Sequence, residues 1–258
     1  MNRSTLMAGA LCAVVLCTAA MGQSIRVGPF LQDASPTNIW IAWETTSGDD
    51  GTVYYGTNPR VLSQSATGLV IPSQGPHRIH HVELPDLEPD TAYWYQVETG
   101  TALSDVFYFR TPPLASKEQP FRFAVLSDTQ GGPVSNMHTQ VINDGIIDFI
   151  TDNYGPDLAR NLAFVLQPGD LVSTGTNYAQ WKTQYFDEAQ NLYQHVPVYP
   201  VAGNHEQDAE WYFRYFKLPE NGTPGFIEHW WYKDHGNVRI IGLDTNGAYR
   251  VPEQLDWL

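Results

Sequence analysis

Polar side chains follow three apolar runs in the second half of the chain. Asp128, Asp170 and the pair Asn204-His205 each begin within four residues of the end of one of these runs. Because the carboxyl ends of parallel strands meet at one edge of an open α/β sheet, we expect these side chains to share a crevice. Carboxylate and amide oxygens are good ligands for divalent metal ions, so Asp128, Asp170 and Asn204 are candidate metal ligands. The runs are Phe123–Leu126, Leu162–Leu166 and Val196–Val201.

Each of these polar residues also has a simpler interpretation. Asp and Asn cap helices well, and a helix is expected after each run. The pattern as a whole favours a site, because Gly169 and Gly203 directly precede Asp170 and Asn204. Glycine allows the chain to turn sharply and to approach a ligand closely.

The elements that must position these residues alternate between strand and helix. Apolar residues recur with helical spacing over 135–152 and 178–193, between the three apolar runs. Strand, helix, strand, helix, strand indicates an α/β layered domain over residues 121–258. We expect Phe123–Leu126 to be buried on both faces, a hairpin of 226–233 and 238–243 turned at 234–237, and a helix starting at Pro252.

Residues 23–113 have a different pattern. Short aromatic and β-branched runs alternate with turn residues, which is typical of a β-sandwich of about seven strands, similar to fibronectin type III. His77, His80 and His81 are interpreted as ordinary strand or turn histidines, with His80 and His81 on opposite faces of one strand. Residues 114–120 are predicted to be a linker.

Residues 1–22 have the features of a secretory signal peptide: a short basic start, an apolar stretch and small residues before Gln23. We therefore expect a secreted or periplasmic protein with no membrane span after cleavage. Both cysteines lie in this segment, so the mature chain has no disulfide, thiolate nucleophile or cysteine-based zinc site. A net charge of -14, from 14 Lys and Arg against 28 Asp and Glu, argues against binding a nucleic acid backbone.

The polar blocks also carry a family resemblance. Ser127-Asp128-Thr129-Gln130, Gly169-Asp170 and Gly203-Asn204-His205-Glu206 resemble the first three blocks of the calcineurin-like metallophosphoesterases. Within them the chain looks most like the purple acid phosphatases, which join a fibronectin type III-like domain to a dimetal phosphatase domain. The resemblance runs from about residue 26 to the end.

The resemblance implies a role for each matching residue. Asp128 resembles a ligand of the first metal ion, Asp170 a carboxylate that bridges both, and Asn204 a ligand of the second. His205 resembles a histidine that contacts the phosphate and helps to protonate the leaving group. The implied cofactors are two metal ions (Fe, Zn or Mn), and the implied reaction is attack of metal-activated hydroxide on a small phosphate ester.

Three departures limit this prediction. Gln130 stands where many relatives have a metal-binding histidine, and Ser173 stands where purple acid phosphatases have a tyrosinate ligand. The family's later histidine blocks have no counterpart, and His229 and His235 are interpreted as surface or structural residues. We therefore expect the metallophosphoesterase domain to be truncated, this sequence to belong to a longer reading frame, and the chain alone to have weak or no phosphatase activity.

Two other functions remain open. One is a secreted binding or adhesion protein that kept the fold and lost catalysis, and the other is a phosphodiesterase on the same core. The aromatic cluster just after the third block is interpreted as core packing, with substrate stacking as the alternative. Its members are Trp211, Tyr212, Phe213, Tyr215 and Phe216.

Overall fold

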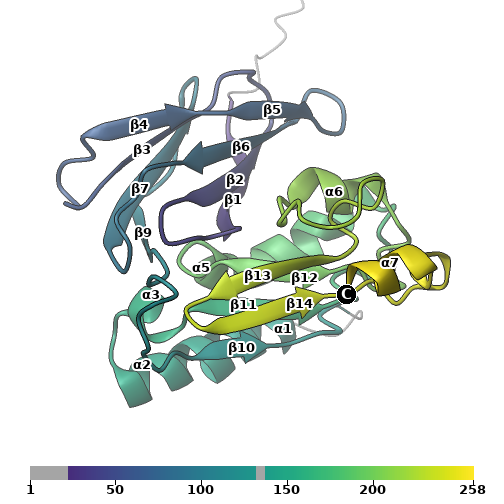
Figure 1. The fold of residues 1–258 in the computed structure, drawn as a ribbon. Coiled ribbons are helices and arrows are strands. Elements are labelled where there is room, and N and C mark those ends of the chain that lie inside the picture. The colour runs from purple at the N-terminus through teal and green to yellow at the C-terminus, as the bar shows by residue number, and fades with distance from the viewer. Residues whose placement is uncertain (1–22, 132–136) are drawn as a thin grey trace, which may run out of the picture.

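The computed structural model describes residues 23–131 and 137–258, so the predicted signal peptide lies outside the described residues. Figure 1 shows an antiparallel sandwich, in purple to blue, beside a domain of helices and strands coloured teal to yellow. The predicted architecture, a β-sandwich followed by an α/β domain, is confirmed. Among the described residues, no helix has both the length and the apolar character needed to cross a bilayer.

Two antiparallel sheets form the sandwich. The first has the order β1 (Ile25–Gln32), β2 (Ile39–Thr45), β6 (Arg78–Leu84), β5 (Leu69–Pro72). The second has the order β4 (Gln64–Thr67), β3 (Thr52–Gly56), β7 (Ala92–Thr99), β8 (Ala102–Leu103), and β9 (Phe107–Arg110) also pairs with β7. Alternate residues of β7 are buried, because successive side chains of a strand point to opposite faces. After the buried residues 111–113, residues 114–120 are exposed.

The second domain is built on a parallel sheet with the order β10 (Phe123–Val125), β11 (Phe164–Pro168), β12 (Val198–Val201). Between the strands run two long helical segments. They are α1 (Met137–Gln140), η1 (Val141–Ile147) and α2 (Asp148–Tyr154), then α4 (Tyr178–Gln180), η2 (Trp181–Phe186) and α5 (Asp187–Tyr193). The central turns of both are π-helical, and the short helix α3 (Leu158–Asn161) precedes β11.

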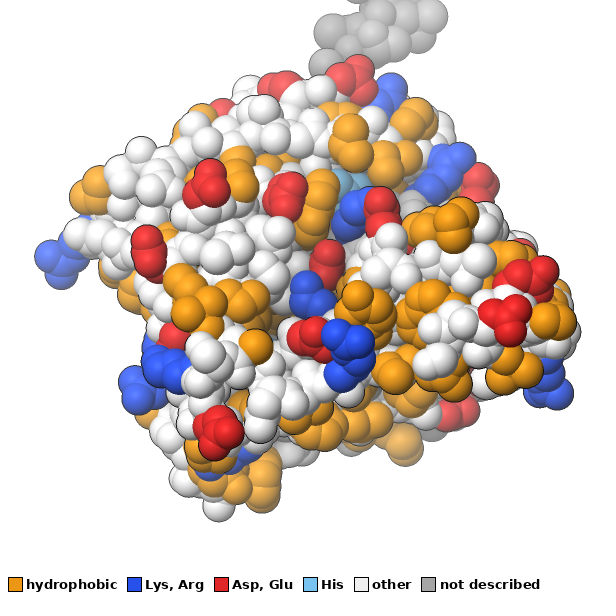
Figure 2. Space-filling model, viewed as in Figure 1, with side chains coloured by type: hydrophobic (Ala, Val, Ile, Leu, Met, Phe, Trp, Pro, Cys, Tyr) orange, Lys and Arg blue, Asp and Glu red, His pale blue; other side chains and the backbone are white. Residues whose placement is uncertain are grey.

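One face of this sheet is covered by a hairpin of β13 (Trp231–His235) and β14 (Val238–Gly242). Trp231 packs 5.8 Å from Tyr199 of β12, and His235 packs 5.2 Å from Phe164 of β11, measured between ring centroids. The remaining elements are α6 (Glu210–Tyr215), η3 (Gly247–Tyr249) and α7 (Pro252–Trp257). Hydrophobic side chains gather on the surface over this hairpin and α7 (Figure 2), where Ile241 and Leu255 are exposed.

Two predicted details of this domain are wrong. Residues 226–230 are turns rather than strand, and β13 starts at Trp231. The run Phe123–Leu126 is not buried on both faces, since Phe123 and Val125 are 50% and 58% exposed. The physical reason is that the hairpin packs on Phe164 of β11 and Tyr199 of β12, and so leaves these two side chains of β10, at one edge of the sheet, without a cover.

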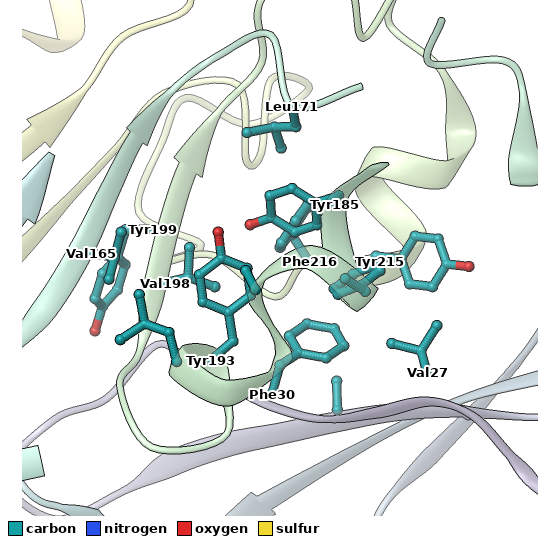
Figure 3. Close-up of a cluster of buried hydrophobic side chains, with 14 of the residues drawn as sticks. Val27, Phe30, Val165, Leu171, Tyr185, Tyr193, Val198, Tyr199, Tyr215 and Phe216 are labelled. Atoms are coloured by element: carbon teal, nitrogen blue, oxygen red, sulfur yellow. The ribbon is translucent and has the colours of Figure 1, made fainter. Parts of the chain in front are cut away.

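One hydrophobic core joins the two domains. Val27 and Phe30 of β1 belong to the same buried cluster as the long helix 178–193 and β12. Figure 3 shows Phe30 below Tyr193, Tyr185 and Phe216, and its ring lies 4.6 Å from that of Phe186. Tyr95 donates a hydrogen bond of 2.8 Å to the Gln194 carbonyl across the same boundary. The sandwich therefore packs directly against the long helix 178–193 of the second domain.

Candidate metal centre

The segments after β10 and β11 run side by side at the carboxyl edge of the sheet. The amide of Asp128 donates to the Gly169 carbonyl at 3.4 Å, and the amide of Gln130 donates to the Asp170 carbonyl at 3.3 Å. Asp128 and Asp170 both adopt left-handed backbone, with φ of 54° and 55°. Such conformations are uncommon for residues other than glycine and cluster at functional sites.

Two glycines let the loops after β11 and β12 touch. A Cβ on Gly169 would lie 2.7 Å from the Gly203 Cα, and a Cβ on Gly203 would lie 2.5 Å from the Asp170 amide nitrogen. It would also overlap the Asp170 Oδ1. A larger residue at Gly203 would therefore displace Asp170, and one at Gly169 would collide with the backbone of Gly203. This close approach is what the two glycines preceding the polar residues provide.

Glu206 holds these loops together and was not singled out from the sequence. Its side chain is completely buried and accepts backbone N–H groups from Asp170 at 2.9 Å, Leu171 at 2.7 Å, Val172 at 3.4 Å and Gly203 at 2.6 Å. Burial raises the pKa of Glu206, while these hydrogen bonds act in the opposite direction. Its place at the end of the Gly-Asn-His-Glu block was the available signal.

The residues after β12 complete the edge. The His205 amide donates to the Asp170 Oδ1 at 3.1 Å, which fixes the orientation of the carboxylate. The His205 Nδ1 lies 2.8 Å from the Ser173 carbonyl and must donate to it, so the Nε2 is left to face a ligand. Asn204 is exposed. Ser173 therefore orients His205 through its backbone.

The residues predicted to be metal ligands line two separate cavities. Asp170 and Asn204 share one of about 550 Å³, whereas Asp128 and Gln130 line another of about 340 Å³. The structure thus places Asp170, Asn204 and His205 together, with Asp128 joined to them through the paired backbones. Their roles as ligands and as catalytic residue remain predictions.

These residues suit metal ions in part. The Gln130 Oε1 is buried and has no hydrogen-bond partner within 23–131 and 137–258, which is costly for an amide oxygen unless a cation or another donor meets it. Oxygen donors from Asp128, Asp170 and Asn204 are of the kind that such cations accept. Over 23–131 and 137–258, however, no group of three or more His, Cys, Asp or Glu is gathered closely enough to hold a metal ion.

The other histidines of the sequence analysis have structural contacts. His80 stacks on Trp43 at 4.7 Å, and His81, on the opposite face of β6, bonds through Nε2 to the Arg214 carbonyl at 2.8 Å. His229 contacts the buried carboxylate of Asp244 at 3.0 Å, and His235 packs against the ring of Phe121 at 4.5 Å. His77 contacts the hydroxyl of Tyr178 at 2.7 Å.

The aromatic cluster after Glu206 is core packing, as predicted. Tyr212, Tyr215 and Phe216 are at most 1% exposed and belong to the large shared core, and Trp211 packs 4.8 Å from the ring of Tyr178. These residues hold α6 against the sheet and lie beneath the site rather than in it.

Comparison with known proteins identifies the family to which this fold belongs. The family described as calcineurin-like phosphoesterase matches residues 121–253, more than half of the chain, and the purple acid phosphatase N-terminal domain matches residues 27–111. Purple acid phosphatase 15 of Arabidopsis thaliana is 25% identical over 272 residues, covering 86% of this chain and 49% of the relative. Purple acid phosphatase 23 of the same plant is 31% identical over 263 residues, covering 84% and 56%.

The fold is shared with a solved structure as well. A purple acid phosphatase isolated from yellow lupin (Lupinus luteus) seeds superimposes with a TM-score of 0.67 at 16% identity, covering 89% of this chain and 46% of that one. The chain spans about half the length of the curated relatives that it matches. With a purple acid phosphatase N-terminal domain followed by the metallophosphoesterase domain, the chain belongs to the calcineurin-like phosphoesterase family.

Proposed function

We propose that this protein hydrolyses phosphate monoesters with two metal ions held at the carboxyl edge of β10, β11 and β12. The observation that carries the proposal is the fixed position of Asp170. Its carboxylate accepts the His205 amide and lies against Gly203, and its own backbone N–H donates to the buried Glu206. Matched relatives include proteins named as purple acid phosphatases and a phosphoenolpyruvate phosphatase of Allium cepa, which supports a phosphate ester as substrate.

Each residue has a stated part in the proposed reaction. Asp128, Asp170 and Asn204 would hold iron, zinc or manganese ions, and Asp170 would bridge the two, as the family resemblance implies. Bound metal ions at such a site lower the pKa of water and neutralise charge on the phosphoryl oxygens. His205, oriented by the Ser173 carbonyl, would present its Nε2 to the phosphate and, with the ring protonated on both nitrogens, would pass the Nε2 proton to the leaving oxygen.

Hydrolysis of p-nitrophenyl phosphate tests this proposal. It is measured with added iron, zinc or manganese, for the 258-residue chain and for the whole reading frame that contains it. We expect Asp170→Asn to abolish turnover and His205→Asn to lower kcat by about 100-fold or more. Glu210→Gln, at an exposed position on α6, should leave turnover unchanged. Activity that survives Asp170→Asn would contradict the proposal.

A secreted binding protein on the same fold is the second candidate. It is favoured by the finding that, across the two described ranges, His, Cys, Asp and Glu do not gather in groups of three that could hold a metal. Absence of turnover in every form of the protein, with no metal retained after dialysis, would support it. Comparison with bis-p-nitrophenyl phosphate separates a phosphodiesterase from a monoesterase.

We also propose that the protein acts outside the cytoplasm, because residues 1–22 have the features of a signal peptide. The N-terminal sequence of the protein purified from its native host tests this. A mature chain starting at Gln23 is expected, and a retained Met1 in the purified protein would contradict it.

A further inference from the structure

His138 lies beside the candidate metal centre and was not singled out from the sequence. It belongs to α1, and its side chain lines the cavity of about 340 Å³ that Asp128 and Gln130 also line. The residue is only 7% exposed, although histidine is strongly hydrated when free. A buried imidazole of this kind needs partners for both ring nitrogens.

Among the residues that the structure describes, only one nitrogen of this ring has a partner. The Nδ1 lies 3.2 Å from the Gln184 carbonyl, which can only accept, so the Nδ1 carries the proton. The Nε2 of the neutral ring is then a lone pair, and it is buried with no hydrogen-bond partner. Burial lowers the pKa of His138, which favours this neutral form.

This arrangement is the one that metal-binding histidines adopt. A ligating histidine usually donates its other N–H to a carbonyl or carboxylate, which sets the tautomer and aims the free nitrogen. Gln130 and Asp128 line the same cavity, and the Gln130 Oε1 is a second buried atom without a hydrogen-bond partner among the described residues. The residues lining this cavity thus offer one nitrogen and two oxygen donors, a set that suits a divalent transition metal ion.

The surrounding contacts hold these groups in place. The Gly131 carbonyl, next to Gln130, accepts from the Gln184 Nε2 at 3.3 Å, and the Ser173 amide donates to the Gln184 Oε1 at 2.8 Å. Gln184 therefore joins the loop after β10 to the loop after β11, while its own backbone carbonyl orients His138. Ser173 stands where the resemblance expected a tyrosinate ligand. His138 comes from a different element, the helix α1.

We propose that His138 is a nitrogen ligand of a divalent transition metal ion that Asp128 and Gln130 also bind. This inference rests on the proposed function only in placing a metal ion at Asp128. It adds a ligand from α1 to a set that the sequence predicted to be made of oxygen atoms alone.

Binding of Co²⁺ to the chelator-treated protein tests the proposal, measured by titration calorimetry and by the visible absorption of the bound ion. We expect His138→Asn to weaken Co²⁺ binding at least tenfold and to change the absorption spectrum. The matched control is His195→Asn. His195 is also partly buried, and its Nδ1 also contacts a backbone carbonyl, that of Tyr108 at 2.8 Å. This control should bind Co²⁺ like the wild type.

A second measurement uses the wild-type protein, so its result does not depend on whether a variant folds. Addition of Zn²⁺ to the wild-type protein should shift the NMR signals of the His138 ring, and those of His195 should stay unchanged. Unchanged His138 signals, no Co²⁺ binding by the wild type, or equal affinity in His138→Asn would each overturn the proposal.

Asp170→Asn separates this inference from the proposed function. We expect this variant to lose turnover, and we expect the Co²⁺ binding that remains in it to depend on His138. If phosphatase activity is absent but His138 still determines Co²⁺ binding, the proposed function fails and the ligand assignment stands. If activity depends on Asp170 but Co²⁺ binding is the same with and without His138, the proposed function stands and the ligand assignment fails.

Discussion

Gly203 is the residue that sets how closely the loops after β11 and β12 can approach. A methyl group there would displace the Asp170 carboxylate. We expect Gly203→Ala to cost about 1–3 kcal/mol of unfolding free energy and to weaken metal binding. The matched control is Gly131→Ala in the neighbouring loop, where a Cβ would have its nearest contact at 3.8 Å. Urea unfolding and a metal titration of both variants measure the difference, and equal behaviour would contradict the assignment.

Glu206 shows how one buried carboxylate can organise a site without entering it. Glutamine in its place has a single acceptor oxygen and turns an NH₂ group toward backbone N–H groups that the carboxylate now satisfies. We expect Glu206→Gln to destabilise the fold by about 2–4 kcal/mol. Glu210→Gln, at an exposed position four residues on, should change stability by less than about 0.5 kcal/mol. Similar losses in the two variants would show that the hydrogen bonds of Glu206 contribute little.

At the scale of elements, the boundaries of the long helix 178–193 were predictable because its apolar residues recur with helical spacing and Asn177 precedes it. The Asn177 Oδ1 accepts the Ala179 amide at 3.1 Å, as a helix cap does. We expect Asn177→Ala to cost about 1 kcal/mol in urea unfolding and Asn177→Asp to cost little. An equal loss in both would mean that the cap does not stabilise this helix.

Other elements could not be predicted, for physical reasons. The run Phe123–Leu126 looks like a central strand, but its burial depends on its neighbours in space, and β10 lies at the edge of its sheet. Residues 226–230, which include Phe226 and Trp230, suit a strand by composition. They form turns instead, and Glu228 has a left-handed backbone with φ of 68°. His138 was missed because the lone pair on its Nε2 follows from a contact to Gln184, far along the chain.

At the scale of the whole molecule, a buried charge ties the two domains together. Glu44 of β2 is completely buried, pairs with Arg26, and accepts the hydroxyls of Tyr178 at 2.5 Å and Tyr215 at 3.0 Å from the second domain. Removing one partner of such a pair leaves an uncompensated charge. We expect Glu44→Gln to cost about 3–5 kcal/mol and Tyr178→Phe about 1 kcal/mol, each within a single unfolding transition that involves both domains. Separate transitions for the sandwich and the α/β domain, seen by calorimetry, would contradict the shared core.

Acid should destabilise the whole molecule, because burial lowers the pKa of His80, His81 and His235 to about 4 in the folded chain. Their ordinary pKa is about 6.5, so the unfolded chain takes up protons first, and stability falls as the pH drops from about 6.5 to 4. Glu228 opposes this, since burial raises its pKa to about 7 and its contribution is lost as the pH rises to that value. Three histidines outweigh one carboxyl group.

We therefore expect the free energy of unfolding in urea to be lower near pH 5 than near pH 7, by about 2 kcal/mol or more. His235→Phe provides the control, because that ring packs among Phe121 and Phe164 and phenylalanine cannot take up a proton. This variant should lose less stability between the two pH values than the wild type. A wild-type protein that is equally stable at both would show that the buried histidines do not govern its response to acid.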